Sequence, residues 1–241
     1  GADLPEDMMA IINGTYYDGT TYRAGTYDDT LNDGNDWDEG DHYLQLSNRE
    51  EELVDLVCKN FNDVILVYNG ANAFELGFVR DYPQIKGVLW SAGQGHVGMT
   101  ALGEIISGQV NPSAKTIDTF VYDVKETPWW NNFGDFNYTN MNDYIYVQEF
   151  FGTTSTEVPS FVNYAEGIYV GYKFYETAAK EGLINYDEMV QYPFGYGLSY
   201  TTFEQTMGPV TEADGTISFD VTVTNTGSVA GKDVVQVYVD P

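Results

Sequence analysis

The chain has 241 residues and carries 37 acidic against 10 basic side chains, which gives a formal net charge of -27 at pH 7. Such an acidic surface repels phosphate backbones and anionic lipids, so we expect no nucleic acid partner and no membrane partner. The sequence also lacks an apolar run of about 18 residues, which argues against membrane insertion. A hydrophobic content of 43% with 15% aromatic residues is typical of a folded globular protein.

The first regular element is expected after residue 43. Residues 5–43 are rich in Gly, Thr, Tyr and Asp without a helical period, and we interpret them as a surface insertion or loop. Ser47 and Glu50 then form a capping box, in which each side chain satisfies a free amide at the start of a helix. The apolar spacing predicts that this helix runs to about Asn60, with the single cysteine, Cys58, on its buried face.

Strands and helices are predicted to alternate over the next segment. Short apolar runs rich in β-branched residues predict buried strands, and apolar residues at helical spacing predict the helices between them. The predicted elements are a strand at 64–68, a helix at 73–80, a strand at 87–90, a helix at 97–107 and a strand at 116–121. This order predicts an α/β fold with a mainly parallel sheet sandwiched by helices, of the flavodoxin-like kind.

Two later segments differ in composition. Residues 128–162 are rich in Trp, Asn, Tyr and Phe and predict a long irregular loop. Residues 217–224 alternate with period two, and after a turn residues 234–239 form a second apolar run, which predicts a hairpin of an immunoglobulin-like β-sandwich. We therefore expect one domain at residues 1–205 and the first strands of an incomplete second domain at 206–241.

A glycine-rich turn at residues 93–98 (GQGHVG) matches the dinucleotide-binding fingerprint. That fingerprint belongs at the first strand of a Rossmann unit, whereas at least one predicted strand and two helices precede it here. The competing interpretation is a tight turn that lets a helix pack closely on the sheet. His42 and His96 lack the spacing of a zinc site, and the acidic stretch 28–39 fails the calcium-loop template, so we expect no metal and no cofactor.

Four stretches together resemble glycoside hydrolase family 3, and they occur in that family's order. They are GQVNPSAK at 108–115, YAEGIYVGYKFY at 164–175, PFGYGLSYTTF at 193–203 and VTVTNTGSVAGKDVVQVY at 221–238. The likeness extends back through residues 90–95 and argues against nucleotide binding at the glycine-rich turn. Ala114 stands where the family usually has glycine, a change that concerns a turn more than the chemistry. The resemblance implies the family's α/β sandwich domain followed by a fibronectin type III-like module.

The resemblance also implies a division of the catalytic residues. Family members are retaining enzymes that use two carboxyl groups about 5 Å apart. Their nucleophile is an aspartate on a barrel domain, which nothing in these residues resembles. The proton donor of many members is a glutamate in a Gly-Glu-Gly-x-Asp motif shortly before a segment like residues 40–44.

Two registers of that motif are open. In one, residues 33–37 match the motif and Asp33 replaces the glutamate as proton donor. In the other, which we prefer, residues 1–5 are the tail of the motif, Asp3 is its aspartate, the glutamate comes just before Gly1, and residues 5–38 are an insertion. The start of the chain, which lacks an initiator methionine, also favours a piece of a longer protein.

Trp37 and Asp3 are the candidate substrate-binding residues, because aromatic faces stack on sugar rings and carboxylates bind their hydroxyls. We expect the chain to be part of a retaining β-glucosidase-type enzyme that acts on an oligosaccharide or β-glucoside, with a barrel domain of the same protein or of a partner chain. The alternative is a non-catalytic carbohydrate-binding or structural module. The acidic, lysine-poor surface slightly favours a secreted or cell-surface protein.

Overall fold

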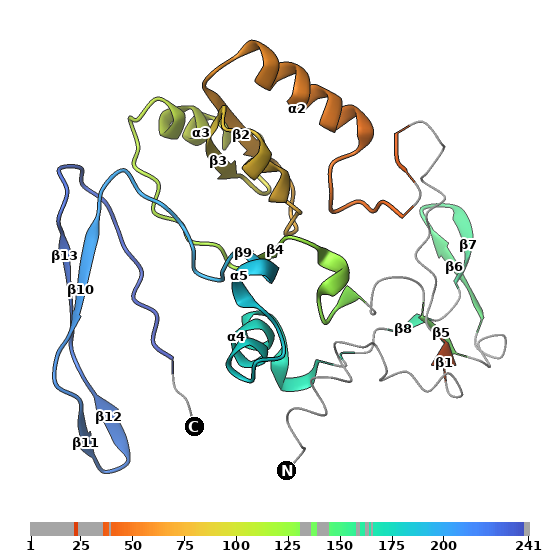
Figure 1. Cartoon of the computed structure of the whole chain (residues 1–241). Coiled ribbons are helices and arrows are strands. Elements are labelled where there is room, and N and C mark those ends of the chain that lie inside the picture. The colour runs from red at the N-terminus through yellow and green to blue at the C-terminus, as the bar shows by residue number, and fades with distance from the viewer. Residues whose placement is uncertain are drawn as a thin grey trace. The chain divides into compact units, whose positions relative to one another are not determined.

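The computed structural model describes most of the chain after residue 35 (Figure 1). The described residues are 22–23, 36–38, 40–130, 136–138, 145–157, 160–161, 164 and 166–238. The chain divides into two compact units, one of Gly1–Leu66, Asn72–Val88 and Thr119–Gln191, the other of Val67–Ala71, Leu89–Asp118 and Tyr192–Pro241. Within the part that the structure describes, no helix is both long and apolar enough to cross a membrane.

Helix α2 (Asn48–Asn60) begins at the predicted capping box. Glu50 N donates to Ser47 Oγ at 3.4 Å, and Ser47 N donates to Glu50 Oε2 at 3.0 Å. Both reciprocal bonds are therefore made, and they fix the first turn of the helix. Cys58 is buried on this helix, with 5% of its surface exposed. The predicted helix and its buried thiol are confirmed.

Two strands follow, β2 (Val64–Tyr68) and β3 (Ile85–Trp90). Val64 N donates to Gln84 O at 2.8 Å, and at the other end Ser91 N donates to Tyr68 O at 2.8 Å. Because the bonded partners advance in the same direction along both segments, the strands are parallel. The α/β class is confirmed, although the strands are only partly buried and Ile65 remains 49% exposed.

The segment between β2 and β3 differs from the prediction of a helix at 73–80. The structure has a 3-10 helix there, η1 (Gly77–Asp81), which starts four residues later and is five residues long. The preceding residues bond to distant parts of the chain instead: Glu75 N donates to Leu44 O at 2.7 Å. Residues 73–76 have no regular structure, and the helical turn begins only at Gly77.

The core of the first unit forms around its later helices. These are η2 (Val124–Glu126), η5 (Gly167–Tyr169), α4 (Tyr172–Lys180) and α5 (Tyr186–Met189). Strands β4 (Phe120–Val121) and β9 (Val190–Tyr192) pair beside them. The buried cluster comprises Val121, Val124, Tyr169, Phe174, Tyr175, Ala178, Met189 and Val190. Burial of so many large side chains supplies the main driving force for folding of this unit.

The strand predicted at 116–121 is reduced to the two residues of β4, and its pairing is antiparallel. Tyr122 N donates to Met189 O at 3.0 Å, whereas Thr116 N donates to Tyr196 O at 2.7 Å. The residue numbers of the bonded partners thus decrease along one segment as they increase along the other, which is the antiparallel pattern.

The segment predicted as an irregular loop at 128–162 contains short antiparallel strands. They are β5 (Phe136–Tyr138) and β8 (Ser160–Phe161), which form a small sheet with β1 (Tyr22–Arg23) in the order β1-β5-β8, and β6 (Tyr146–Phe150) and β7 (Thr153–Glu157), which form a hairpin. The predicted loop therefore includes regular pairing, some of it with a strand from the first 43 residues.

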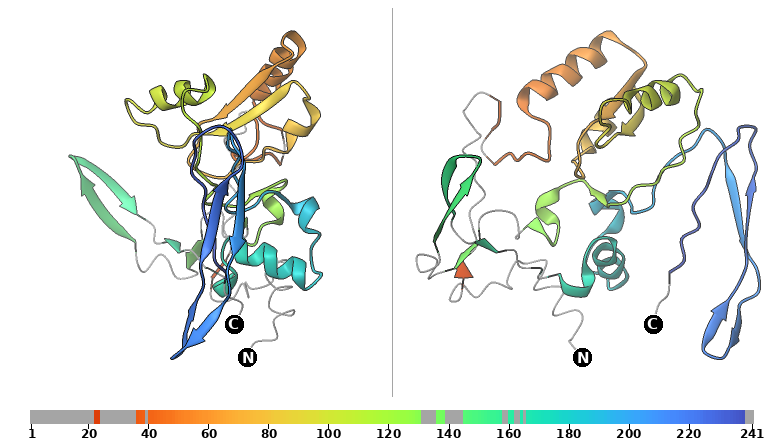
Figure 2. Two further views of the ribbon diagram at one scale, coloured as in Figure 1. Left: turned by 90° about the vertical axis from the view of Figure 1, so that its left-hand side faces the viewer. Right: turned by 180° about the vertical axis from the view of Figure 1, so that it is seen from behind.

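The second unit contains helix α3 and four further strands. They are α3 (Met99–Ile106), β10 (Phe203–Met207), β11 (Thr211–Ala213), β12 (Thr216–Ser218) and β13 (Val221–Asn225). β10 pairs with β13, and the β11–β12 hairpin lies between them in the sequence (Figure 2). The expected pairing of β13 with a strand at 234–239 is wrong for the described residues, because residues 234–238 form no strand and Gln205 Nε2 donates to Val234 O at 3.1 Å.

Asn111 and Lys115, in the first family-like stretch, tie three segments of the second unit together. Asn111 Oδ1 accepts from Tyr200 N at 2.7 Å, and its Nδ2 donates to Ala230 O at 3.0 Å. Lys115 Nζ donates to Gly197 O at 2.7 Å and lies 3.5 Å from Asp233 Oδ1. The stretch at 111–115 is therefore a structural link between two other family-like stretches.

Candidate functional site

Of the three residues predicted for the site, Trp37 lies in the part of the chain that the structure describes. Asp3 and Asp33 lie outside the described residues, so their structural roles stay predictions. Trp37 is half-buried and its ring meets Tyr43 edge to face, with 5.8 Å between ring centroids and 68° between planes. Tyr43 is 45% exposed. The pair offers an aromatic surface of the kind that stacks on sugar rings.

The segment that carries this aromatic pair is fixed by its own carboxylates. Asp41 Oδ2 accepts from Asp38 N at 2.7 Å, and Asp41 Oδ1 accepts from Gln45 Nε2 at 2.7 Å. Asp36 Oδ1 accepts from Arg49 N at 2.9 Å, at the start of helix α2. An acid at a helix N-terminus is stabilised there by the free amides and the helix dipole. Hydrogen bonds of Asp36 and of Asp41 thus fix the segment at its start and at its end.

His42 and Glu75 form the buried polar centre of the site. His42 is 2% exposed, and its Nε2 lies 3.2 Å from Glu75 Oε1, whose side chain is 17% exposed. Leu44 N donates to His42 Nδ1 at 3.2 Å. Because Nδ1 accepts a hydrogen bond, the proton of the neutral imidazole belongs on Nε2, where it is donated to Glu75. Both ring nitrogens are therefore satisfied.

Glu75 also holds a second segment of the chain. Its Oε1 accepts from Val124 N at 2.7 Å. The adjacent Lys125 Nζ donates to Gly40 O at 2.7 Å, and the Trp130 ring lies 5.2 Å from the imidazole of His42. One carboxylate thus joins residues 40–44 to the segment that runs from η2 toward Trp130.

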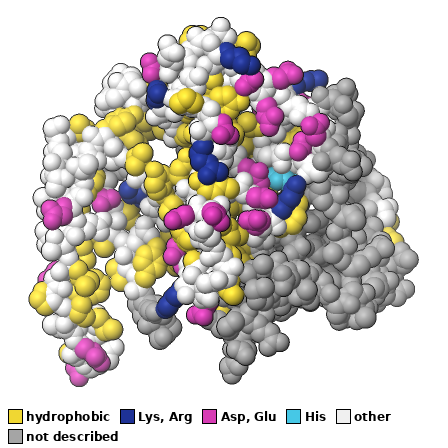
Figure 3. All heavy atoms as spheres, in the orientation of Figure 1, with side chains coloured by type: hydrophobic (Ala, Val, Ile, Leu, Met, Phe, Trp, Pro, Cys, Tyr) yellow, Lys and Arg dark blue, Asp and Glu magenta, His cyan; other side chains and the backbone are white. Residues whose placement is uncertain are grey.

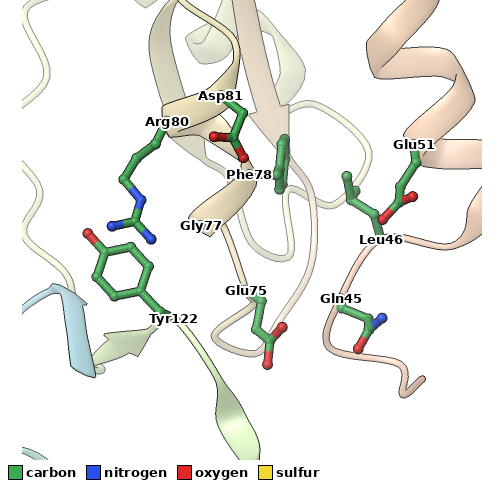
Figure 4. A pocket seen from close by; sticks show the side chains of 9 residues that line it. All are labelled: Gln45, Leu46, Glu51, Glu75, Gly77, Phe78, Arg80, Asp81 and Tyr122. Carbon is green, nitrogen blue, oxygen red and sulfur yellow. The ribbon is translucent and has the colours of Figure 1, made fainter. Parts of the chain in front are cut away.

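A cavity of about 310 Å³ opens beside this carboxylate (Figure 4). Its lining residues are Gln45, Leu46, Glu51, Glu75, Gly77, Phe78, Arg80, Asp81 and Tyr122. The guanidinium of Arg80 lies over the Tyr122 ring, 3.8 Å from its centroid, which is a cation–π contact. The cavity therefore combines two aromatic side chains with three carboxylates and one side-chain amide, the kinds of group that bind hydroxylated ligands.

The charge of the described surface fits an uncharged ligand better than an anionic one. Asp and Glu side chains are spread over the face shown in Figure 3, with Lys and Arg scattered singly among them. Among the described residues, no three of His, Cys, Asp and Glu lie close enough to hold a metal ion.

Sequence reasoning missed Glu75, whose carboxylate contacts both His42 and the backbone amide of Val124. A usable signal was present, because residues 72–75 follow a strand that pairs in parallel, and ligand sites of α/β folds gather at the carboxyl ends of such strands. Arg80 and Tyr122 carried no comparable signal.

Comparison with known proteins decides the family. The model of the "Glycosyl hydrolase family 3 C-terminal domain" matches residues 19–172. This chain belongs to glycoside hydrolase family 3. The matched range includes His42, Glu75 and the residues lining the cavity, whereas the predicted site residue Asp3 lies before it.

Similar proteins agree with this assignment. Beta-glucosidase A of Butyrivibrio fibrisolvens is 34% identical over 226 residues, which are 87% of this chain and 24% of that protein. An exo-alpha-(1->6)-L-arabinopyranosidase of Bifidobacterium breve is 32% identical over 78% of this chain and 21% of that protein. The solved beta-glucosidase of Paenibacillus barengoltzii matches 80% of this chain and 18% of its own with 26% identity and a TM-score of 0.59. The family 3 chain thus spans about a quarter or less of the length of these relatives.

Proposed function

We propose that the complete protein hydrolyses terminal β-linked glucosides and that this chain supplies the α/β domain beside the active site. Membership of family 3 supports the proposal, as does the beta-glucosidase from Butyrivibrio fibrisolvens. The observation that carries it is the fixed segment at 40–44. In the family members that this chain resembles, the corresponding segment closely follows the proton donor. Here His42 and Glu75 hold the segment in place.

The mechanism we propose is the retaining one. A nucleophile on a barrel domain outside this chain attacks the anomeric carbon, while a carboxylic acid about 5 Å away protonates the leaving oxygen and later activates water. That acid is either the residue before Gly1, which we prefer, or Asp33. Asp3 and Trp37 are proposed to contact the sugar, and the Trp37 ring lies beside a second aromatic ring, that of Tyr43.

The fine architecture is part of the same proposal. We place the α/β domain at residues 1–205, as a mainly parallel flavodoxin-like sandwich, and the first strands of a fibronectin type III-like module at 206–241. The parallel pair β2–β3 supports the first assignment. The antiparallel pairs β10–β13 and β11–β12 support the second. A barrel domain, in the same protein or in a partner chain, completes the enzyme.

The proposal is tested on the polypeptide that joins this chain to its barrel domain, assayed with 4-nitrophenyl β-D-glucoside. We expect the joined protein to hydrolyse this substrate. Under the preferred register, Asp33→Asn should change its kcat/KM by no more than about twofold, because Asp33 is then a loop residue. A loss of about 100-fold or more in Asp33→Asn would assign the proton donor to Asp33 instead. If the joined protein bound cellobiose but hydrolysed neither cellobiose nor 4-nitrophenyl β-D-glucoside, the proposed hydrolase function would be wrong. A carbohydrate-binding role would then replace it.

A further inference from the structure

The buried imidazole of His42 joins residues 40–44 to the segment that follows β2. Its Nδ1 accepts from Leu44 N at 3.2 Å, and its Nε2 lies 3.2 Å from Glu75 Oε1. The backbone makes a second link between the same two segments, because Glu75 N donates to Leu44 O at 2.7 Å. One imidazole and one backbone bond thus tie residues 40–44 to Glu75.

Only the neutral ring of His42 can make both of its bonds. A neutral imidazole has one N–H donor and one acceptor, whereas the protonated ring has two donors. A proton on Nδ1 would face the N–H of Leu44, which is itself a donor. The bond from Leu44 N is therefore lost when the ring takes a second proton. Because His42 is only 2% exposed, little water reaches the ring to compensate for that loss.

The other groups around the ring leave its protonation as the event that decides this bond in mild acid. The carboxylate of Glu75 faces Nε2, and the segment after η2 places the uncharged indole of Trp130 with its centroid 5.2 Å from that of the ring. Lys125, on η2, donates its charged Nζ to Gly40 O at 2.7 Å. Among unperturbed side chains, only histidine changes charge between about pH 5 and pH 8. The bond is therefore present at the upper end of this range and is lost toward the lower end.

The neighbours of His42 in the chain belong to the aromatic pair and its support. Tyr43 follows it, and the Tyr43 ring contacts Trp37 edge to face. Asp41 precedes it, is the second carboxylate near the ring, and accepts from Asp38 N at 2.7 Å. Release of His42 would therefore free the backbone on which the proposed sugar-binding surface is carried.

We propose that His42 is a positioning residue that acts as a pH-sensitive lock on the candidate site. Its neutral ring holds residues 40–44 against Glu75, and its protonation releases them and slows glycoside hydrolysis in mild acid. This inference rests on the proposed function for its effect on the rate. Its structural part, the release of residues 40–44, is measurable without any turnover.

The test uses the polypeptide that joins this chain to its barrel domain, between about pH 5.5 and pH 7.5, the range in which histidine titrates. Hydrogen exchange gives the protection factors of residues 41–46, corrected for the intrinsic pH dependence of exchange, and kcat/KM is measured with 4-nitrophenyl β-D-glucoside. His42→Gln keeps one donor and one acceptor in its amide but does not titrate. The matched control is His96→Gln, which changes the exposed second histidine of this chain.

In the wild type we expect the protection of residues 41–46 to fall by about fivefold or more toward the acid end, as the loss of one hydrogen bond requires. It should change by less than about twofold in His42→Gln, which has no imidazole to protonate. The wild type should also lose about 3- to 10-fold more kcat/KM across this range than His42→Gln, since the other groups titrate alike in both proteins. His96→Gln should follow the wild type in both measurements.

Helix α2 gives a reference within the wild type in case His42→Gln does not fold. Its amides bond without any histidine, so their protection should stay constant while that of residues 41–46 falls. The lock is refuted if the two segments respond alike, or if residues 41–46 respond alike in the wild type and His42→Gln.

The two proposals fail in different ways. If protection falls as expected but kcat/KM has the same pH dependence in the wild type and His42→Gln, the positioning role is wrong and the proposed hydrolysis stands. If protection falls as expected and the wild type has no turnover, the proposed hydrolysis is wrong and the lock at His42 stands.

Discussion

Tyr82 Oη donates to Asp55 Oδ1 at 2.9 Å, a bond between the end of η1 and the middle of α2. Asp55 also accepts from Lys59 Nζ at 2.7 Å, one helical turn further along. The lysine and then the tyrosine lower the pKa of Asp55 below its usual 3.8. The carboxylate in turn raises the pKa of Tyr82 from 10.0 to about 12. The pair links helix α2 to the segment that carries Arg80.

This bond predicts a specific loss of stability in alkali. A pKa that is higher in the folded state than in the unfolded state gives stability that is complete below pH 10 and is lost as pH rises through about 12. We expect the melting temperature of the wild type to fall more steeply between these pH values than that of Tyr82→Phe, which lacks the ionisable group. Equal slopes for the two proteins would contradict the prediction.

Removal of the Glu75 carboxylate should destabilise the fold. Glu75→Ala leaves both Val124 N and the buried His42 without their acceptor, and we expect it to lower the free energy of unfolding by about 2–4 kcal/mol. Glu75→Gln keeps an oxygen that accepts both bonds and should lose about 1 kcal/mol. Urea denaturation measures both. The control is Glu204→Ala on an exposed position of β10, which should change stability by less than about 0.5 kcal/mol; a similarly small effect at Glu75 would refute its central role.

Two glycines should respond in opposite ways to alanine. A Cβ at Gly197 would overlap Ala114 O and would lie 3.3 Å from Lys115 Cα, which are backbone atoms that cannot move aside easily. We expect Gly197→Ala to cost about 1–3 kcal/mol. Gly103 lies inside α3 with nothing within 4 Å of a Cβ, so Gly103→Ala should stabilise by about 0.5–1 kcal/mol. Thermal unfolding distinguishes the two, and the same sign for both would show that one of the packing arguments is mistaken.

Asp233 should make the second unit sensitive to acid. The amide of Gln205, with Val234 N and Lys115 in support, lowers the pKa of Asp233 below its usual 3.8. A pKa that is lower in the folded state gives stability that is present above 3.8 and is lost as pH falls through the folded value. We expect the protection factors of residues 230–238 against hydrogen exchange, which are corrected for the intrinsic pH dependence of exchange, to fall in acid in the wild type. Asp233→Asn should show faster exchange already at neutral pH, with a weaker pH dependence; an unchanged pH dependence would argue against this carboxylate.

Local sequence signals predicted the elements that local interactions determine. The Ser47–Glu50 capping box lies within one turn, and α2 starts there as expected. The apolar runs at 64–68 and 87–90 form β2 and β3. The family-like stretches led to the family that the comparisons show.

Elements that depend on distant partners were not predictable in the same way. Glu75 bonds to Leu44 and Val124, far away in the sequence, and so the helix expected at 73–80 is shortened to η1. The side chain of Gln205 binds the carbonyl of Val234, in a segment whose apolar pattern predicts a strand. Propensity and periodicity describe neighbours along the chain, whereas these bonds join groups about 30 to 50 positions apart.

The rate at which the protein's single thiol is labelled can report how often helix α2 opens. Cys58 is buried on that helix, two residues before its last residue, Asn60, and a thiol reagent reaches it only when the helix detaches. With no second cysteine in the sequence, the observed rate belongs to this one site. The labelling rate should therefore rise when the Asp55–Tyr82 bond is removed and stay constant when only the second unit is altered.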